Sequence, residues 1–206
     1  MKEMTHPWEL EERCYAAGYT AVCGADEAGA GPLAGPVYAA AVILPRGLLI
    51  PGLNDSKKLT EKKRETLYPL ICEQAIAWAV ASVGEREIDE INILRARMLA
   101  MDRAIRALDV PADFALIDGN RAEGIACPHE TVVEGDARSA SIAAASILAK
   151  VSRDRYVTEV LDPQYPEYAF ARHKGYGTKL HYEMLDRFGP CPAHRRSFLK
   201  KWEAKR

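Results

Sequence analysis

Four acidic residues stand at positions where carboxylates from separate segments could bind a divalent cation together. Asp26 and Glu27 end a short apolar segment, Asp118 ends a second one, and Asp136 follows a third one just before a long run of small and apolar residues. In an α/β sheet, ligands bind beyond the carboxyl ends of the strands, so these segments would bring the acids to one edge. Because crowded carboxylates repel one another, such a cluster is costly unless a cation binds there.

No histidine or cysteine accompanies these acids, and a set of carboxylates suits hard ions such as Mg²⁺ or Mn²⁺ rather than zinc. Two such ions held by carboxylates are the usual means of phosphodiester hydrolysis, since one activates a water and the other stabilises the leaving oxygen. The residue types therefore permit a metal-dependent nuclease.

Each acid also has a simpler interpretation. Asp118 precedes a glycine and could form only a turn, and Asp136 alone could cap a helix. Adjacent Asp26 and Glu27 would point to opposite faces of a regular strand, so both reach one site only if the strand has ended or bulges there. The coincidence of three segments favours a shared site more than any single acid does.

Residues 28–36 form a glycine- and proline-rich segment that is neither a Walker loop nor a dinucleotide fingerprint, because no Gly-Lys-Ser/Thr follows and the third glycine is misplaced. The segment is either a tight turn or a loop whose backbone approaches a sugar-phosphate closely, which glycine permits. Residues 54–58, with two lysines, form a second and weaker candidate for phosphate contact.

Further along the chain, residues 164–178 alternate aromatic rings with cations, a pattern typical of stacking on sugars or bases and of contact with phosphates. These residues are Tyr165, Tyr168, Phe170, Arg172, His173, Lys174 and Tyr176. His173, His181 and His194 lack metal-ligand spacing, so we do not expect them to bind a metal.

The elements that must position these residues alternate between strand and helix patterns. We expect strands over residues 22–26, 37–44, 79–83, 114–117 and 131–133, and helices over residues 7–17, 60–78, 87–108, 139–160, 179–188 and 195–202, with Thr60 as an N-cap. This alternation predicts an α/β fold with an antiparallel first pair of strands. No repeat is found, so we expect one domain over residues 1–206, with a helical C-terminal extension from about residue 162.

The chain of 206 residues has 48% hydrophobic and 28% charged residues, which are ordinary values for a globular protein. Its net charge of −1 by itself argues against a nucleic-acid partner. The charge is uneven, however, because residues 150–206 carry 13 Lys and Arg against 7 Asp and Glu, whereas residues 1–149 carry 15 against 22. A basic C-terminal quarter fits contact with a phosphate backbone.

The longest apolar run, residues 37–45, is too short to cross a bilayer, and no signal segment opens the chain. The five cysteines are scattered and form no C-x-x-C pair, which favours a reducing cytoplasm over disulfides or a zinc site. We therefore expect a cytoplasmic protein with no membrane partner. A monomer is expected because no long exposed apolar stripe is apparent.

The chain resembles bacterial ribonuclease HII over nearly its whole length. The matching segments are Gly24–Pro36, Leu53–Leu59, Glu87–Asp89 with Asn92–Leu94, Leu116–Asn120, Gly135–Asp136 with Ser141–Asp154, His173–Tyr176 and His194–Phe198. These segments are ordered and dense along the chain.

The resemblance implies a ribonuclease H-like fold, with a mixed β-sheet flanked by helices and a helical C-terminal region. It also implies endonucleolytic cleavage of the RNA strand of RNA/DNA hybrids, and cleavage 5′ to single ribonucleotides in duplex DNA, leaving 3′-OH and 5′-phosphate ends. The implied cofactor is Mg²⁺ or Mn²⁺, with two ions in the substrate complex. The implied partner is an RNA/DNA hybrid or ribonucleotide-containing duplex DNA.

The resemblance also assigns roles to individual residues. Asp26, Glu27, Asp118 and Asp136 would be the catalytic and metal-binding acids. Tyr176 resembles the family tyrosine that packs on the sugar at the ribonucleotide–deoxyribonucleotide junction. The other substrate-binding candidates are a glycine loop and four lysines, namely Gly29, Ala30, Gly31, Lys57, Lys58, Lys150 and Lys174.

One position departs from the family pattern. The family loop normally reads Gly-Arg-Gly, and here it reads Gly29-Ala30-Gly31, which is compatible with natural variation and with a deliberate substitution. The arginine helps to hold the backbone around the junction ribonucleotide, whose 2′-OH distinguishes RNA from DNA. Ala30 keeps the backbone N–H but lacks the cation, so we expect weaker substrate binding or relaxed junction preference, without loss of metal binding.

Two alternatives fit a similar fold. The first is a non-catalytic module that binds RNA/DNA hybrids or DNA, with Ala30 as a sign of lost activity. Retention of all four acids argues against it, since a pure binder gains nothing from acids that face phosphates. The second is a different nuclease or recombinase, which would need acids at comparable strand ends but not the junction-reading loop.

Overall fold

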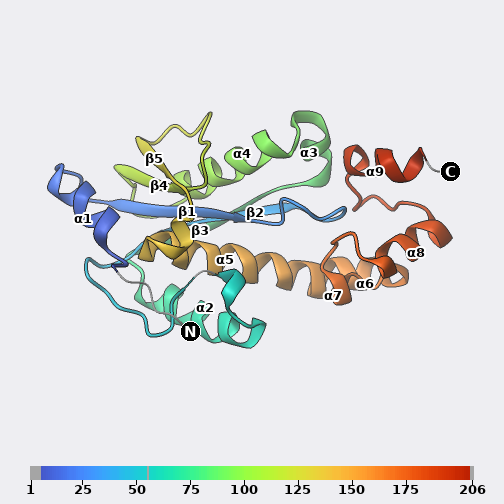
Figure 1. Cartoon of the computed structure of the whole chain (residues 1–206), viewed down its shortest axis with the longest axis horizontal. Helices are drawn as coiled ribbons and strands as arrows, with labels where there is room; N and C mark the ends of the chain where they lie inside the picture. The colour runs from blue at the N-terminus through green and yellow to red at the C-terminus, as the bar shows by residue number, and fades with distance from the viewer. Residues whose placement is uncertain (1–5, 55, 205–206) are drawn as a thin grey trace.

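In the computed structural model, which describes residues 6–54 and 56–204, five strands form one mixed sheet. The strands are β1 (Val22–Ala28), β2 (Val37–Ile43), β3 (Ala77–Val83), β4 (Phe114–Asp118) and β5 (His129–Val132). Their order is β3-β2-β1-β4-β5, with β2 antiparallel to both β1 and β3, and with β4 parallel to both β1 and β5 (Figure 1). The predicted α/β fold with an antiparallel first pair is confirmed.

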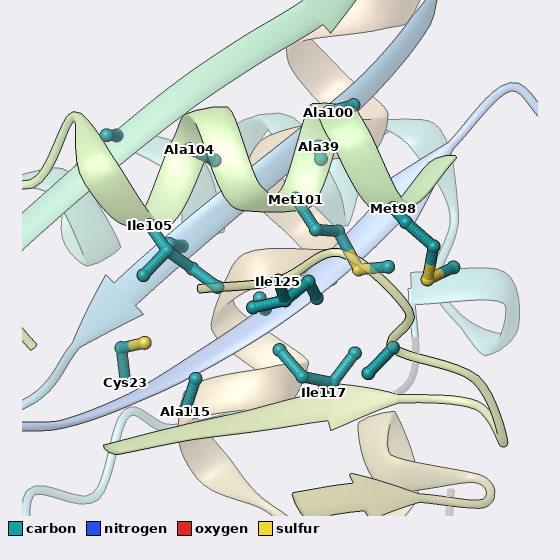
Figure 2. Close-up of a cluster of buried hydrophobic side chains, with 14 of the residues drawn as sticks. Cys23, Ala39, Met98, Ala100, Met101, Ala104, Ile105, Ala115, Ile117 and Ile125 are labelled. Atoms are coloured by element: carbon teal, nitrogen blue, oxygen red, sulfur yellow. The ribbon is translucent and has the colours of Figure 1, made fainter. Parts of the chain in front are cut away.

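Helices cover both faces of this sheet. On one face lie α2 (Glu61–Gln74) and α5 (Ala140–Tyr156), and on the other lie α3 (Glu85–Ile91) and α4 (Ile93–Arg106) (Figure 1). In Figure 2, apolar side chains of α4 face the sheet, with Met98, Met101 and Ile105 above Cys23, Ala115 and Ile117. The small side chains in the sheet let the helices approach closely at the packing density of a protein interior.

The start of α5 is held against β1, the strand that carries the first two acids. A Cβ atom at Gly24 would lie 2.2 Å from the backbone nitrogen of Ile142, so a side chain there would collide with the helix backbone. Ser139 caps α5 by accepting the N–H of Ile142 at 3.1 Å. The interpretation of Asp136 as the cap of this helix is therefore wrong.

The N-terminal helix α1 (Glu9–Ala16) also anchors the start of α5. The buried carboxylate of Glu11 accepts hydrogen bonds from the hydroxyl of Ser139 at 2.6 Å and from the N–H of Ser141 at 3.0 Å. A buried carboxylate paired in this way fixes the position of the helix start.

Beyond α5 the chain forms a helical C-terminal part. A π-helical turn, Val157–Leu161, leads to α6 (Asp162–Gln164), α7 (Phe170–His173), α8 (Lys179–Phe188) and α9 (Arg196–Glu203). The core of this part includes Leu33 and Ala34, which belong to the connection between β1 and β2. The C-terminal part therefore packs directly on the glycine-rich segment. Among the helices of the described chain, none is long and apolar enough to cross a membrane.

The single helix predicted over residues 87–108 is two helices, α3 and α4. Asn92 separates them with a φ of 67°, and its side chain accepts the N–H groups of Leu94 and Arg95 at 3.0 and 3.2 Å. The same residue thus ends one helix and caps the next, and Leu94 in the first turn of α4 is 48% exposed.

The second helix begins as predicted but ends earlier. Thr60 caps α2 by accepting the N–H of Lys63 at 3.3 Å. The helix ends at Gln74, and Trp78, which was predicted to belong to it, pairs with Val42 in the β2–β3 ladder. The third strand, β3, therefore begins at Ala77 rather than at the predicted residue 79, because pairing with β2 outweighs the helical spacing in this part of the chain.

Candidate active site

A cavity of about 230 Å³ lies at the end of β1, where this strand continues past the end of its parallel neighbour β4. Strands, helix and loops distant in sequence contribute to its wall. The lining residues are Asp26, Glu27, Ala28, Gly29, Ala30, Gly31, Ser56, Lys57, Asp118, Ser146, Lys150 and Tyr176. Three of the four predicted acids and the whole predicted glycine loop are thus brought together.

The expectation that the first strand ends or bulges at its acids is wrong. β1 continues to Ala28 in regular antiparallel register with β2. Asp26 and Glu27 therefore leave opposite faces of the sheet, the first toward Ser146 of α5 and the second toward Arg97 of α4. Both still line the cavity, because β4 ends beside them and leaves this edge of β1 open.

Asp26 is a buried carboxyl surrounded by other acids. Burial raises the pKa of Asp26 well above its usual range, and the charges of Glu27 and Asp118 raise it further. Hydrogen bonds from Ser146 and from the N–H of Glu27, the latter at 2.7 Å, oppose this shift. The Ser146 hydroxyl also lies 2.7 Å from that of Ser56, which ties the lysine-containing loop to α5.

Glu27 is partly buried beside an arginine that contacts only one of its oxygens. Nη2 of Arg97 lies 2.6 Å from Oε1 of Glu27, whereas Oε2 is buried and has no hydrogen-bond partner among the described residues. Burial raises the pKa of Glu27, although the charge of Arg97 opposes this shift. A buried carboxylate oxygen without a partner calls for an explanation, and a bound ion is one.

Asp118 and Asp136 are connected through the turn that follows β5. The N–H of Gly135 donates to Oδ1 of Asp118 at 2.8 Å, and Glu134 before it has a left-handed φ of 54°. Asp136 is buried, and its Oδ2 lies 3.4 Å from Nζ of Lys57. Asp136 is not among the residues that line the cavity, but the lysine that it pairs with is.

The four acids, called the acid cluster below, suit a divalent cation by the chemistry of their donors. All are carboxylates, and one of them has a buried oxygen without a partner in the described chain. Burial lowers the pKa of Lys57, but the charges of Asp136, Asp26 and Asp118 outweigh it and leave that pKa raised. Within residues 6–54 and 56–204, no group of three His, Cys, Asp or Glu side chains is close enough together to hold a metal ion, so the acids lie near one another but are not arranged around one point.

The glycine loop and Tyr176 form the opposite part of the cavity wall. A Cβ atom at Gly31 would lie 3.8 Å from Cε1 of Tyr176, whose ring is 42% exposed. Nζ of Lys150 lies 5.9 Å from the centre of the same ring. An exposed ring beside a cation and an open backbone can stack on a sugar while the neighbouring groups contact phosphate.

Most of the aromatic segment over residues 164–178 is core rather than binding surface. Tyr168 and Phe170 are buried, and their rings stack at 5.3 Å within the C-terminal part. Of the rings in that segment, all described, Tyr176 is the one that lines the cavity. The interpretation of the whole segment as a binding surface is wrong, because the C-terminal helices need these rings for a core of their own.

The four candidate lysines divide into two groups. Lys57 and Lys150 line the cavity, whereas Lys58 and Lys174 are not among its lining residues. Lys150 also pairs with Asp154, with Nζ 2.8 Å from Oδ1. The geometry therefore supports phosphate contact for the first two lysines only.

Sequence reasoning missed several residues that support the site. Ser146 and Arg97 contact the acids, and Arg153 and Arg195 hold the glycine loop through its carbonyl groups. Arg153 and Arg195 lie in segments that resemble the family, which was the available signal. Nothing in the local pattern around Arg97 indicates its partner.

Known proteins share both the sequence and the fold of this chain. The profile of the ribonuclease HII family matches residues 23–201. The chain is 52% identical to ribonuclease HII of Caldicellulosiruptor saccharolyticus over 193 residues, 94% of each protein, and 59% identical to that of Dechloromonas aromatica over 177 residues, 86% of this chain and 90% of the relative. The crystal structure of ribonuclease H2 from Pyrococcus horikoshii has a TM-score of 0.73 and 26% identity, covering 90% of this chain and 98% of that one.

Proposed function

Because this chain belongs to the ribonuclease HII family, and is therefore a ribonuclease H hydrolase that acts on RNA/DNA hybrids, we propose that it cuts 5′ to a ribonucleotide and leaves 3′-OH and 5′-phosphate ends. The proposed substrates are hybrids and duplex DNA with single embedded ribonucleotides. The observation that carries this proposal is the shared cavity of Asp26, Glu27 and Asp118 with the glycine loop and Tyr176.

We propose that the acid cluster holds one or two divalent ions, Mg²⁺ or Mn²⁺. When bound, such ions supply an activated water and stabilise the leaving oxygen of a phosphodiester. The support is the carboxylate donor set, the unpartnered Oε2 of Glu27 and the raised pKa of Asp26. Positive charge at this place would relieve the repulsion that raises the pKa.

The other cavity residues would bind and orient the substrate strand. The backbone of Ala30 and Gly31 is open to the cavity, and the ring of Tyr176 is placed to stack on a sugar beside it. Lys57 and Lys150 are placed to contact phosphates. We propose that the protein acts as a monomer, since its sequence shows no long exposed apolar stripe.

We propose that Ala30 weakens substrate binding without abolishing cleavage. The side chain adds no cation to the loop, so the backbone N–H groups are the donors left for a phosphate there. The chain belongs to a hydrolase family, and no observation favours the non-catalytic binding module, a different nuclease or a recombinase.

The test is cleavage of a DNA duplex with one embedded ribonucleotide, labelled on the ribonucleotide strand, with Mg²⁺, with Mn²⁺ and with a chelator. We expect one cut on the 5′ side of the ribonucleotide, only with a divalent ion, and no cut in the all-DNA duplex. Ligation of the cleaved strand requires a 3′-OH and a 5′-phosphate, so it distinguishes the expected ends from other termini. Cleavage in the chelator, or a cut at another position, would contradict the proposal.

A further inference from the structure

The glycine loop is held from behind by the side chain of Arg195, which is fully buried at the start of α9. Its Nη2 donates to the carbonyl of Gly29 at 2.7 Å, and its Nη1 donates to that of Ala30 at 3.0 Å. Its Nε donates to the carbonyl of Gly35 at 2.8 Å. One guanidinium therefore binds the glycine loop and also the later part of the glycine-rich segment, residues 28–36.

A second buried guanidinium, Arg153 of α5, binds the end of the same glycine-rich segment. Its Nη2 donates to the carbonyl of Ala34 at 3.3 Å and its Nε to that of Pro36 at 3.2 Å. Both terminal nitrogens also donate to the carbonyl of Lys174 at 3.1 Å, two residues before the cavity tyrosine. A Cβ atom at Gly29 would lie 2.0 Å from Nε of Arg153, so the arginine occupies the space that a side chain there would need.

These contacts determine which backbone groups of the loop are open to the cavity. The carbonyls of Gly29 and Ala30 are turned to a buried side chain, whereas the N–H groups of Ala30 and Gly31 donate to no other group in the described chain. Both residues line the cavity. Successive N–H groups that face a cavity, with positive charge behind them, favour an anion such as phosphate.

The arginine pair, Arg153 and Arg195, is not explained by ion pairing. No carboxylate lies within 4.0 Å of the Arg195 guanidinium among the described residues, although the charges of Glu85 and Asp89 act on it from farther away. Asp154 is 4.0 Å from Nη1 of Arg153. Burial and the charge of Arg153 lower the pKa of Arg195 to about 9, which leaves it charged at neutral pH. Two buried like charges are costly, so a role beyond stability is the better account of them.

A carboxylate of α3 fixes the start of α9. Asp89 of α3 accepts the N–H of Arg196 at 2.8 Å, and the N–H and hydroxyl of Ser197 at 2.9 and 2.5 Å. The backbone N–H of Arg195 meanwhile donates to the carbonyl of Leu33 at 2.9 Å. Asp89 therefore sets the position from which Arg195 reaches the loop.

We propose that Arg195 and Arg153 are positioning residues that turn the N–H groups of Ala30 and Gly31 toward a phosphate of the substrate strand, and that Asp89 positions Arg195. This inference rests on the proposed function, because the anion is taken to be a phosphate of the bound duplex. It gives the start of α9 a role in substrate binding that its distance in sequence from the acids does not suggest. Loss of either arginine should weaken substrate binding and leave the metal-binding acids intact.

The experiment compares Arg195→Lys and Arg195→Met with the unchanged chain on the duplex with one embedded ribonucleotide. We expect KM to rise about tenfold or more for Arg195→Met and less for Arg195→Lys, with kcat within about twofold, since the lost bonds are charge-assisted and lysine replaces only part of a guanidinium fork. Affinity for Mn²⁺ without substrate, measured by calorimetry, should not change. Arg103→Met is the matched control, because Arg103 pairs with exposed Glu87 outside the cavity.

If Arg195→Met does not fold, Asp89→Asn decides the question, since it leaves both arginines in place. We expect a smaller rise in KM for this variant and unchanged Mn²⁺ affinity. An unchanged KM in a folded Arg195→Met chain, or a fall in kcat alone, would overturn the inference. If the unchanged chain does not cut the duplex at all, the proposed function fails instead, so the two failures are distinguishable.

Discussion

The acid cluster and the arginine pair are both groups of like charges that are buried or partly buried, but their hydrogen bonds differ. Each arginine donates to at least three backbone carbonyls, so its guanidinium is well satisfied within the chain. In the acid cluster, Oε2 of Glu27 has no partner among the described residues, and the pKa of Asp26 is raised by burial and by its acidic neighbours. The hydrogen bonds of the arginines are thus satisfied within the chain, whereas the acids are suited to bind a cation from solution.

The largest expected effect concerns turnover in the acid cluster. Asp136→Asn should lower kcat by at least about 100-fold, because even a supporting partner of a metal ligand typically contributes 10- to 100-fold. Cleavage of the ribonucleotide-containing duplex with Mg²⁺ measures this, and circular dichroism checks the fold. Asp109→Asn, at an exposed aspartate, is the control. Full activity of the Asp136 variant would remove this acid from the site.

The comparison also predicts that loss of an arginine and loss of an acid change the free energy of unfolding in opposite directions when no divalent ion is present. Arg153→Met should lower the free energy of unfolding by about 3 kcal/mol, because buried carbonyls lose their donors. Asp26→Asn should raise it at neutral pH, because the variant removes a charge that its neighbours disfavour. Urea denaturation in a chelator measures both. Changes of the same sign would show that the two groups do not differ in the way described.

A cation added to the loop should improve substrate binding. Ala30→Arg should raise affinity for the duplex about 10- to 150-fold, since a charge-assisted contact contributes about 1.5–3 kcal/mol. The measurement is KM together with the preference for a ribonucleotide–deoxyribonucleotide junction over a uniform hybrid. Unchanged cleavage and unchanged preference would show that the backbone alone binds the substrate at this position.

Two buried histidines near the start of α9 should make the protein less stable in acid. Burial lowers the pKa of both His181 and His194 to about 4, and their Nε2 atoms lie 3.0 Å apart beside Arg195. In the unfolded chain they titrate near 6.5, so between pH 6.5 and 4 the unfolded state binds more protons and stability rises with pH. We expect the two histidines together to cost about 3–4 kcal/mol of stability from pH 7 to pH 5, measured by urea denaturation. His181→Gln should reduce this pH dependence, whereas a change at exposed His129 should not.

Local patterns in the sequence predict much of the fold and the position of the acids. The apolar spacing predicts α8 with the bounds that the structure has, and Thr60 is the predicted cap of α2. Asp118 ends β4 as expected, because an apolar segment bounded by a glycine turn indicates a buried strand and its end. The boundaries at Asn92 and Trp78 differ because side-chain capping and strand pairing override helical spacing there.

By itself, the sequence determined which residues can do chemistry and which strand carries each, since residue type and periodicity are local properties. Its net charge of −1 concealed an acidic body and a basic C-terminal quarter. Only the tertiary structure decided that Phe170 is core while Tyr176 lines the cavity, and that Arg195 meets Gly29 across 166 positions. Such contacts depend on how the elements pack together, so no short stretch of sequence encodes them.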